Sequence, residues 1–179
     1  MGLPRAPGFR LELAPFRLEK LLDYEPCGLH PVHLGDCFGK DGRYRVLHKL
    51  GHGGFATVWL CRDTDAKETT RYVALKILGA DASTEDCPEL HLGRLRHLLS
   101  QESQNIKVAS AICLPLDQFT VEGPNGKHLC FVYPVLGPRV DFGSLSDQEA
   151  YAKVLRTICS DIVQAVSFLH SHGICHGGK

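Results

Sequence analysis

The sequence predicts an α+β fold in which a five-stranded antiparallel sheet with one helix is followed by a second, longer helix. Three observations support this prediction. Apolar, β-branched segments alternate with turns over residues 44–136, a leucine-striped segment starts near residue 88, and residues 146–172 keep a continuous helical period. At 179 residues, the chain is long enough for one such domain and little more.

Changes in composition divide the chain into four parts. Residues 1–22 are punctuated by Pro and Arg, which is typical of an extension, and residues 23–43 are rich in Gly, Pro, Asp and His, which favours a looped approach to the fold. Residues 44–136 contain the predicted strands, and residues 137–179 contain the final helix. The sheet and its helix are therefore expected to lie in the third part.

Five segments have the composition of strands. Each is apolar or β-branched and is followed by polar residues or by Gly and Pro, which favour a turn. The predicted strands are 44–50, 57–62, 72–78, 111–121 and 128–136. The first two are expected to form a hairpin around a glycine-rich tip, and the last two are joined by a predicted turn at 122–127.

Two segments have helical signals. In the first, residues 81–86 are polar and Pro88 suits a first helical turn, after which five leucines form an apolar stripe. In the second, Ser146 and Glu149 have the spacing of a capping box, and Gly173 lies at the usual position for a helix end. We expect the second helix to be the longer one.

Charge and cysteine content exclude several classes of protein. Twenty basic residues balance twenty acidic ones, so no global field favours nucleic acid, and no apolar run approaches the length of a membrane span. The eight cysteines have irregular spacing and no Cys-x-x-Cys pair. They are interpreted as reduced thiols of a cytoplasmic or nuclear protein, with a disulfide framework as the alternative. A mitochondrial leader, suggested by Arg5, Arg10 and Arg17, is disfavoured by Glu12 and Glu19.

The glycine-rich tip has the spacing of a phosphate-binding loop. Glycines let backbone N–H groups approach phosphate oxygens without a side-chain clash. Gly51, Gly53 and Val58 match the G-x-G-x-x-G-x-V pattern by which protein kinases cover ATP, and Ala56 departs from its third glycine. The expected nucleotide contacts in this stretch are Leu50, Gly51, His52, Gly53, Gly54, Phe55, Ala56 and Val58.

A lysine and a glutamate complete the expected phosphate site. Lys76, in a Val-Ala-Leu-Lys strand with Ala74 facing the nucleotide, is expected to neutralise the α and β phosphates. Glu89, in the first turn of the leucine-striped helix, is the expected ion-pair partner, and Glu85 is the alternative. The competing interpretation is a glycine-rich hairpin beside an exposed strand lysine with no ligand.

Several longer segments resemble one kinase family. The sequence is similar to the SR-protein-specific serine/threonine kinases, in a fungal-type form, over about residues 23–179. The segments that carry the resemblance are 24–32, 34–36, 43–46, 49–51, 57–60 and 135–137. The resemblance implies a kinase N-lobe and hinge over residues 44–136, preceded by the family lead-in at 23–43 and followed by the start of a C-lobe at 137–179.

The resemblance also implies an adenine-reading hinge and a set of partners. Tyr133 would be the gatekeeper behind the adenine, and the carbonyl of Pro134 and the N–H of Leu136 would contact the base. Proline at 134 lacks an N–H, but that position uses its carbonyl. The implied cofactors are ATP and Mg²⁺. The implied substrates are Arg-Ser-rich splicing or RNA-processing factors, with no direct binding of nucleic acid or membrane.

The last residues match the entry to a catalytic loop only in part. By resemblance, His176 is the motif histidine, but Gly178 stands at the aspartate position, and no metal-binding Asn or Asp-Phe-Gly segment follows before Lys179. A polypeptide of these 179 residues is therefore expected to be catalytically inactive. The alternative function is a pseudokinase-like module that binds nucleotide or a partner without catalysis.

A cluster of metal-type side chains offers one further alternative. Cys27, His30, His33 and Cys37 lie within eleven residues, and zinc favours tetrahedral Cys/His sets. However, ligand pairs usually bracket a longer loop, and the family lead-in accounts for His30 without a metal. No metal site is therefore expected from residues of this chain.

Overall fold

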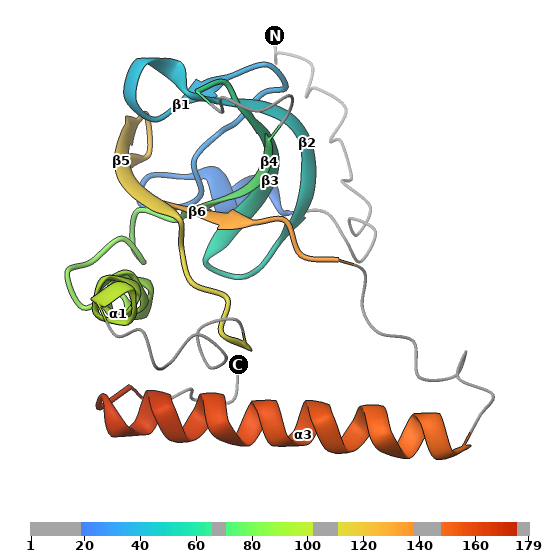
Figure 1. Cartoon of the computed structure of the whole chain (residues 1–179). Coiled ribbons are helices and arrows are strands. Elements are labelled where there is room, and N and C mark those ends of the chain that lie inside the picture. The colour runs from blue at the N-terminus through green and yellow to red at the C-terminus, as the bar shows by residue number, and fades with distance from the viewer. Residues whose placement is uncertain (1–18, 66–70, 102–110, 138–147, 175–179) are drawn as a thin grey trace, which may run out of the picture.

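The computed structural model describes residues 19–65, 71–101, 111–137 and 148–174. These residues form a six-stranded antiparallel sheet with strand order β1-β2-β3-β4-β6-β5, with helix α1 beside it and helix α3 across one end (Figure 1). The strands are β1 (Cys37–Phe38), β2 (Tyr44–His52), β3 (Ala56–Asp63), β4 (Arg71–Leu78), β5 (Asp117–Gly123) and β6 (Gly126–Pro134). The helices are η1 (Leu21–Tyr24), η2 (Lys40–Gly42), α1 (Pro88–Gln101) and α3 (Gln148–Ser171).

The predicted α+β class is confirmed, and all five predicted strands occur. β5 begins at Asp117, later than the predicted start at residue 111. The sixth strand, β1, lies in a segment that was predicted as a loop, and it pairs Cys37 with Arg45 and Phe38 with Tyr44. A strand of two residues is too short to show an alternating pattern, so the sequence carried no signal for it.

A tight turn returns the chain from β1 to β2. Gly39 has a φ of 79°, and Asp41 in η2 has a φ of 54°, both in the region that favours residues with small or locally bonding side chains. A Cβ at Gly39 would lie 2.8 Å from the ring of Tyr44. Glycine at this position therefore allows Tyr44 to pack into the sheet core.

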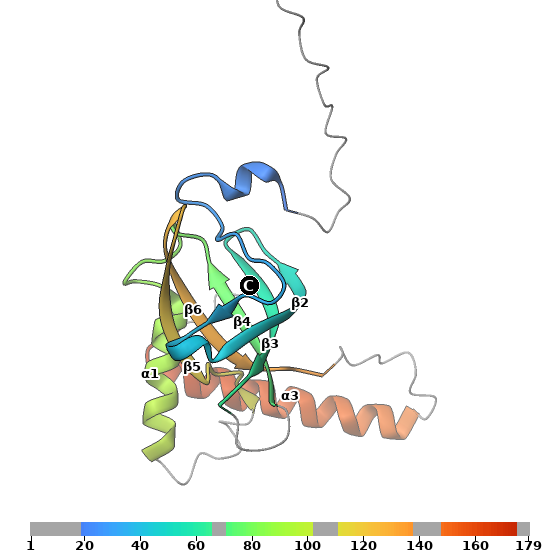
Figure 2. The same ribbon diagram turned by 90° about the horizontal axis from the view of Figure 1, so that it is seen from above.

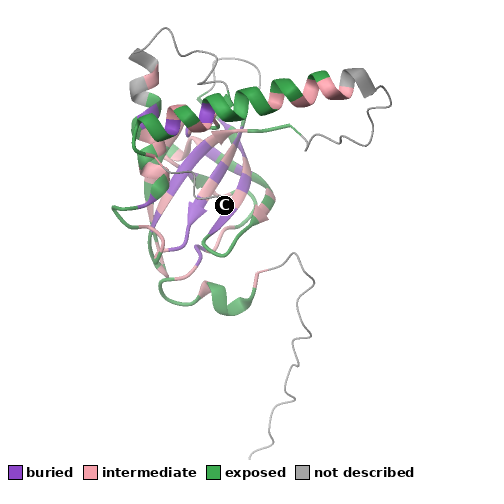
Figure 3. Ribbon diagram, turned by 90° about the horizontal axis from the view of Figure 1, so that it is seen from below, coloured by how far each residue is buried: buried purple, intermediate pink, exposed green. Residues whose placement is uncertain are grey.

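The two faces of β4 have different partners. Val73, Leu75 and Ile77 are buried in the larger core cluster, together with Trp59 and other residues of the sheet. Alternation along a strand places Ala74 and Lys76 on the opposite face. The full buried set of the larger cluster is Phe38, Tyr44, Val46, Trp59, Cys61, Val73, Leu75, Ile77, Cys130 and Val132. Figure 3 shows that the buried positions are concentrated in the strands of the sheet.

The smaller core cluster lies on the Lys76 face of the sheet. It contains Ala56, Leu78, Cys87 and Phe131, with Leu90 of α1 packed against it. Arg96 of α1 donates a hydrogen bond to the carbonyl of Pro115 at 2.8 Å, just before β5. Figure 2 shows α1 beside the β5–β6 end of the sheet. The smaller cluster therefore attaches the start of α1 to the strand that carries Lys76.

The segment before β1 is fixed to the sheet. The backbone N–H of Cys27 donates to Asn125 at 2.8 Å, and the Asn125 side chain donates to the carbonyl of Leu29 at 2.5 Å. The N–H of Ala80 donates to Gly28 at 3.0 Å. His30 is buried, and its ring centroid lies 4.8 Å from that of His128 on β6. The lead-in is thus part of the domain, and it touches the connection between β4 and α1.

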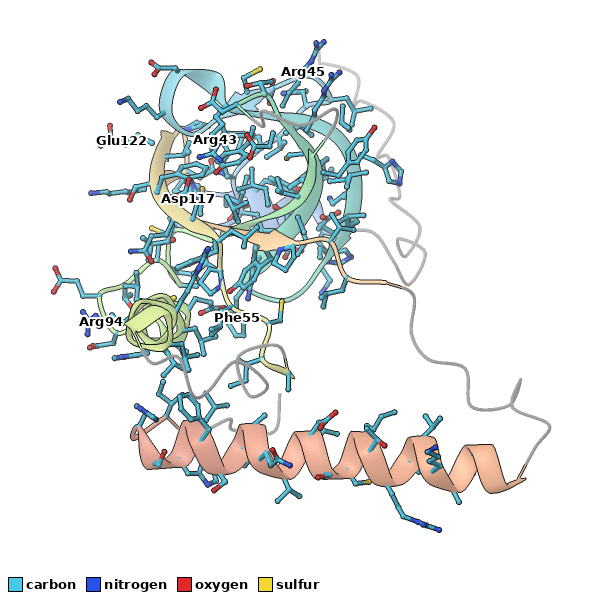
Figure 4. All side chains as sticks on the ribbon, in the orientation of Figure 1. Arg43, Arg45, Phe55, Arg94, Asp117 and Glu122 are labelled. Carbon is cyan, nitrogen blue, oxygen red and sulfur yellow. The ribbon has the colours of Figure 1, made fainter. Side chains whose placement is uncertain are left out.

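An arginine clamp joins the start of β2 to the end of β3. Arg43 donates two hydrogen bonds to Asp63, from Nε to Oδ1 and from Nη2 to Oδ2, each at 2.8 Å. Arg43 and Asp117 also lie near each other, and the hydroxyl of Tyr44 donates to Asp117 at 2.7 Å (Figure 4). These side chains line a cavity of about 320 Å³ that includes none of the expected nucleotide contacts.

The long helix α3 ends where glycine was predicted to stop it. Gly173 has a φ of 72°, and the N–H of Ile174 donates to the carbonyl of Leu169 at 2.9 Å. Ala165 and Leu169 are buried, whereas Ile162 and Val163 are exposed. The predicted capping residue Ser146 lies outside the described residues. In the part of the chain that is described, no helix is long and apolar enough to cross a membrane.

The Cys/His cluster does not assemble into a metal site. Cys27 and Cys37 are exposed, His33 is exposed, and His30 packs against His128 and Phe38. Over residues 19–65, 71–101, 111–137 and 148–174, no three His, Cys, Asp or Glu side chains come together as metal ligands. The zinc alternative has no support in this geometry. Seven cysteines fall in the described ranges, and each is a free thiol.

The buried His30 predicts a loss of stability in mild acid. Burial, followed by the neighbouring His128, lowers the pKa of His30, although Asp36 acts in the opposite direction. The unfolded chain takes up this proton near pH 6.5, and the folded chain resists it. Because the unfolded state then binds more protons, the free energy of unfolding falls as the pH drops below about 6.5.

This loss is measured by urea unfolding at about pH 7.5, above the ordinary pKa of histidine, and at about pH 5.5, below it. His30→Phe is expected to show a smaller loss of unfolding free energy between the two pH values than the wild type. His48→Gln, which changes an exposed histidine of β2, is the control and should keep the wild-type loss. Equal losses in His30→Phe and wild type would contradict the prediction.

Candidate nucleotide site

The glycine-rich tip connects β2 to β3 as a hairpin. The N–H of Gly53 donates to the carbonyl of Ala56 at 2.9 Å, which closes the tip. The carbonyl of Phe55 accepts a hydrogen bond from the N–H of Gly79 at 2.8 Å, so the tip is also held by the end of β4. The Phe55 side chain is 63% exposed. The tip is therefore anchored through its backbone while its side chain stays accessible.

The fold itself does not require glycine at the tip. Gly51, Gly53 and Gly54 all lack a positive φ, and a Cβ built on any of them would meet no atom within 4 Å. This contrasts with Gly39, where a side chain would strike Tyr44. An anionic ligand can approach a backbone closely only where no side chain fills the space above it. The three glycines of the tip leave that space open.

Four of the expected contact residues share one face of the sheet. In the register of the strands, Val58 of β3 is opposite Lys76 of β4, and Ala74 of β4 is opposite Tyr133 of β6. Directly opposed residues of antiparallel strands point to the same side. Because Ala74 and Lys76 are two residues apart, all four side chains lie on the face away from the larger core cluster.

The structure brings Lys76 and Glu89 together. Lys76 Nζ lies 2.5 Å from Glu89 Oε1, and both side chains are partly buried. Glu89 occupies the first turn of α1, where the positive end of the helix dipole favours a carboxylate. Glu85, the alternative partner, is exposed and precedes α1. Lys76 thus has a fixed acidic neighbour, and its side chain is 30% exposed.

Hydrogen bonds keep the Glu89 carboxylate ionised despite its burial. Burial acts to raise the pKa of Glu89, but hydrogen bonds from Cys87 and Lys76, together with the charge of Lys76, outweigh it and lower the pKa. The Cys87 thiol donates to Glu89 Oε2 at 3.0 Å. No role for Cys87 was expected from the sequence. The one sequence feature that could have indicated the contact is the position of this cysteine, two residues before the glutamate at the start of a helix.

The expected hinge residues follow at the end of β6. Tyr133 is partly buried, and burial, followed by the charge of Glu89, raises its pKa, so its phenol is neutral. Pro134 is the last residue of β6, and Leu136 is 68% exposed. The chain therefore leaves the sheet after Pro134, two residues before the exposed Leu136.

Some predicted site residues lie outside the described part of the chain. These are His176 and Gly178 of the expected catalytic-loop entry. An Asp-Phe-Gly tripeptide is present at 141–143, and it also lies outside the described residues. In the order of kinase motifs, the metal-binding Asp-Phe-Gly follows the catalytic loop, whereas this tripeptide precedes α3. It is therefore not assigned that role.

Comparison with known proteins identifies relatives of one kind. The chain is 36% identical to the serine/threonine-protein kinase spk-1 of Caenorhabditis elegans over 97% of its own length. It is 31% identical to human SRSF protein kinase 3 over 94%, and 37% identical to a serine/threonine protein kinase of Aspergillus fumigatus over 79%. The chain spans 17%, 31% and 34% of these three relatives, respectively. No family model matches the chain.

A solved structure shows the same fold. A crystal structure of a kinase domain superposes with a TM-score of 0.52 at 18% identity, covering 79% of this chain and 38% of that one. The fold is that of a protein-kinase N-lobe with part of a C-lobe. The sequence relatives are serine/threonine protein kinases, SRSF protein kinase 3 and spk-1 among them, and the chain is similar to them over nearly its whole length.

The open space at the tip predicts that a side chain there affects ligand binding and not folding. Gly53→Ala should change the free energy of unfolding by less than about 1 kcal/mol, because the new Cβ meets nothing. The same change should weaken binding of a non-hydrolysable ATP analogue about tenfold, because the methyl group stands between the backbone and the phosphates. Thermal unfolding and isothermal titration calorimetry measure the two effects.

The matched control is Gly126→Ala in the β5–β6 turn. Gly126 has a φ of 132°, and a Cβ there would lie 2.9 Å from the Cβ of Ala80. This change should cost about 1–3 kcal/mol of stability, while the protein that remains folded binds the analogue as the wild type does. Unchanged analogue affinity in Gly53→Ala would mean that the tip does not cover phosphates.

Proposed function

We propose that this chain forms the ATP-binding lobe of a serine/threonine protein kinase that transfers the ATP γ-phosphoryl group to protein Ser or Thr. The observation that carries the proposal is the contact between Lys76 Nζ and Glu89 Oε1 at 2.5 Å, with Lys76 directly opposite Val58, which follows the open glycine tip. Lysine and glutamate held in this way, beside a backbone free to approach phosphates, are the parts that kinases need in the N-lobe.

The chain's own residues have separate tasks in this proposal. The ammonium of Lys76 binds the α and β phosphates, and Glu89 holds that ammonium in place. The backbone N–H groups of the tip at 51–56 donate to phosphate oxygens, and Phe55 at its end shields them from water. Val58 and Ala74 form an apolar surface for the adenine ring.

The hinge positions the base. The Pro134 carbonyl accepts from the adenine amino group, and the Leu136 N–H donates to a ring nitrogen, as in the implied hinge. Tyr133 closes the end of the adenine pocket, since its side chain lies on the same face as Ala74. The ATP supplies the reactive phosphoryl group, and these residues orient it.

The donor set fits ATP, but it supplies no ligand for Mg²⁺. In the described ranges, no cluster of three or more His, Cys, Asp or Glu could hold a metal ion. Mg²⁺ is therefore assigned no ligand among the described residues. His176 is proposed only as the motif histidine at the start of the catalytic loop, with Gly178 at the aspartate position.

The proposed substrates are Arg-Ser-rich splicing or RNA-processing factors. One relative is named for the SRSF proteins on which it acts, and it is similar to nearly the whole of this chain. Such substrates would place the protein in the cytoplasm or nucleus. A pseudokinase-like role, in which the lobe binds nucleotide or a partner without catalysis, is the second candidate because of Gly178.

Nucleotide binding is the direct test of the proposal. The 179-residue chain is expected to bind an ATP analogue with a dissociation constant that rises at least about tenfold, or ~1.4 kcal/mol, in Lys76→Met. Lys49→Met is the matched control, because it removes a lysine that has other partners. Lys49 of β2 lies over the ring of Trp59 of β3 and pairs with Glu19. Equal affinities in Lys76→Met and wild type would refute the assignment of the site.

Phosphoryl transfer separates the two candidate functions. A polypeptide of these 179 residues is expected to transfer no phosphate from labelled ATP to an Arg-Ser repeat peptide above the Lys76→Met background, because Gly178 offers no carboxylate to the substrate hydroxyl. A longer product of the native transcript that supplies an aspartate and an asparagine after His176 is expected to be active. Transfer by the 179-residue chain itself would contradict the first expectation.

A further inference from the structure

Cys87, the residue immediately before α1, makes a contact that the proposed function does not use. Its side chain is buried, with 2% of the residue exposed, and its thiol donates to Glu89 Oε2 at 3.0 Å. The other oxygen of the same carboxylate, Oε1, lies 2.5 Å from Lys76 Nζ. The two oxygens of Glu89 are thus divided between a neutral donor and a cation.

The thiol of Cys87 is a hydrogen-bond donor at neutral pH. Burial, followed by the hydrogen bond to Glu89, raises the pKa of Cys87 to about 11. A buried thiol of this kind remains protonated and is a poor nucleophile. Its proton points to Glu89, so the contact adds to the forces that keep Glu89 ionised.

The position of the thiol is set by the sheet. Cys87 packs with Ala56, Leu78 and Phe131 in the smaller core cluster. Its backbone is also fixed, because its N–H donates to Thr84 at 3.2 Å and its carbonyl accepts from Leu90 at 3.0 Å. The donor is therefore held in place by three strands and by the first turn of α1.

The Glu89 carboxylate, in contrast, is held by hydrogen bonds from the side chains of Cys87 and Lys76 and from its own backbone N–H. A glutamate side chain has three rotatable bonds and loses much rotamer freedom when fixed. Glu89 also lies in the first turn of α1, where helices open most easily. A second donor on Oε2 removes the rotation that a single contact to Lys76 would leave.

We propose that Cys87 is a positioning residue of the nucleotide site, whose thiol holds the Glu89 carboxylate so that its other oxygen faces Lys76. This inference rests on the proposed function, because the position of Lys76 matters most when it binds phosphates. Cys87 touches neither nucleotide nor substrate. It acts through Glu89, and through Glu89 on Lys76.

The other ionisable groups near Glu89 do not replace this contact. Lys76 reaches Glu89 from β4, and Tyr133 on β6 feels its charge. Tyr133 is a neutral phenol, and no hydrogen bond joins it to Glu89 among the bonds of the described residues. Loss of the thiol therefore leaves Oε2 without the donor that now fills this position.

The test compares a variant that keeps the donor with one that removes it. Cys87→Ser retains a hydroxyl donor, and Cys87→Val fills a similar volume without one. The first readout is the pKa of Glu89, which is measured by carbon-13 NMR of its side-chain carboxyl in the 179-residue chain. The carboxyl resonance is assigned by its absence in Glu89→Gln. The valine variant is expected to raise the pKa of Glu89 by about half a unit to one unit, and the serine variant to keep it within about 0.3 of the wild type.

The second readout is the affinity for the ATP analogue. Cys87→Val should weaken it about three- to tenfold, and Cys87→Ser should restore it to near the wild-type value, because the ion pair is again oriented. Cys61→Val is the control. It removes a buried thiol of the larger core cluster, which donates to the Trp59 carbonyl at 3.9 Å. This variant should leave the pKa of Glu89 and the affinity unchanged.

The outcomes separate this inference from the function on which it rests. A pKa of Glu89 that is equal in wild type, Cys87→Ser and Cys87→Val overturns the inference, whatever the affinities. If the valine variant does not fold, Cys87→Ala takes its place with the same two readouts. A wild-type chain that binds no analogue, while its Glu89 pKa still depends on Cys87, overturns the proposed function and supports the Cys87–Glu89 contact.

Discussion

The alternation of side chains along β4 is the constraint on which the rest of the domain depends. One face of this strand, carrying Val73, Leu75 and Ile77, is completely buried in the larger core cluster. A shift of one residue in its register would exchange the two faces, so burial of this set holds Lys76 on the other side. The position of the one charged side chain in the middle of β4 is therefore a consequence of apolar packing.

The lead-in and α1 complete opposite faces of the same strand. Residues 27–38 cover the larger core cluster through Phe38 and Val32 and bond to the segment that follows β4. On the other face, the smaller cluster attaches the start of α1, so Glu89 arrives at Lys76 from its first helical turn. The pair is partly exposed, and such pairs contribute little to stability. Its importance in the proposed site lies in geometry.

The hairpin tip differs from the other turns in what the fold demands of it. At Gly39 and Gly126 the backbone or a close neighbour requires glycine, whereas Gly51, Gly53 and Gly54 face open space. Glycines that folding does not need are more informative about a ligand than glycines that a turn needs. Together with the Lys76–Glu89 contact, this contrast is the strongest structural support for a nucleotide site.

The sequence by itself determined the order of strands and helices, the pairing of Lys76 with Glu89, and the end of α3 just before Gly173. These features follow from local periodicity, turn residues and motif spacing, all of which depend on residues close together in the chain. Only the tertiary structure decided the short strand β1, the contact between His30 and His128, and the donation from Cys87 to Glu89. His30 and His128 are about a hundred residues apart, and Cys87 looked like a small hydrophobic residue beside a helix. Contacts of this kind depend on which side chains the packed sheet brings together, and no local pattern encodes them.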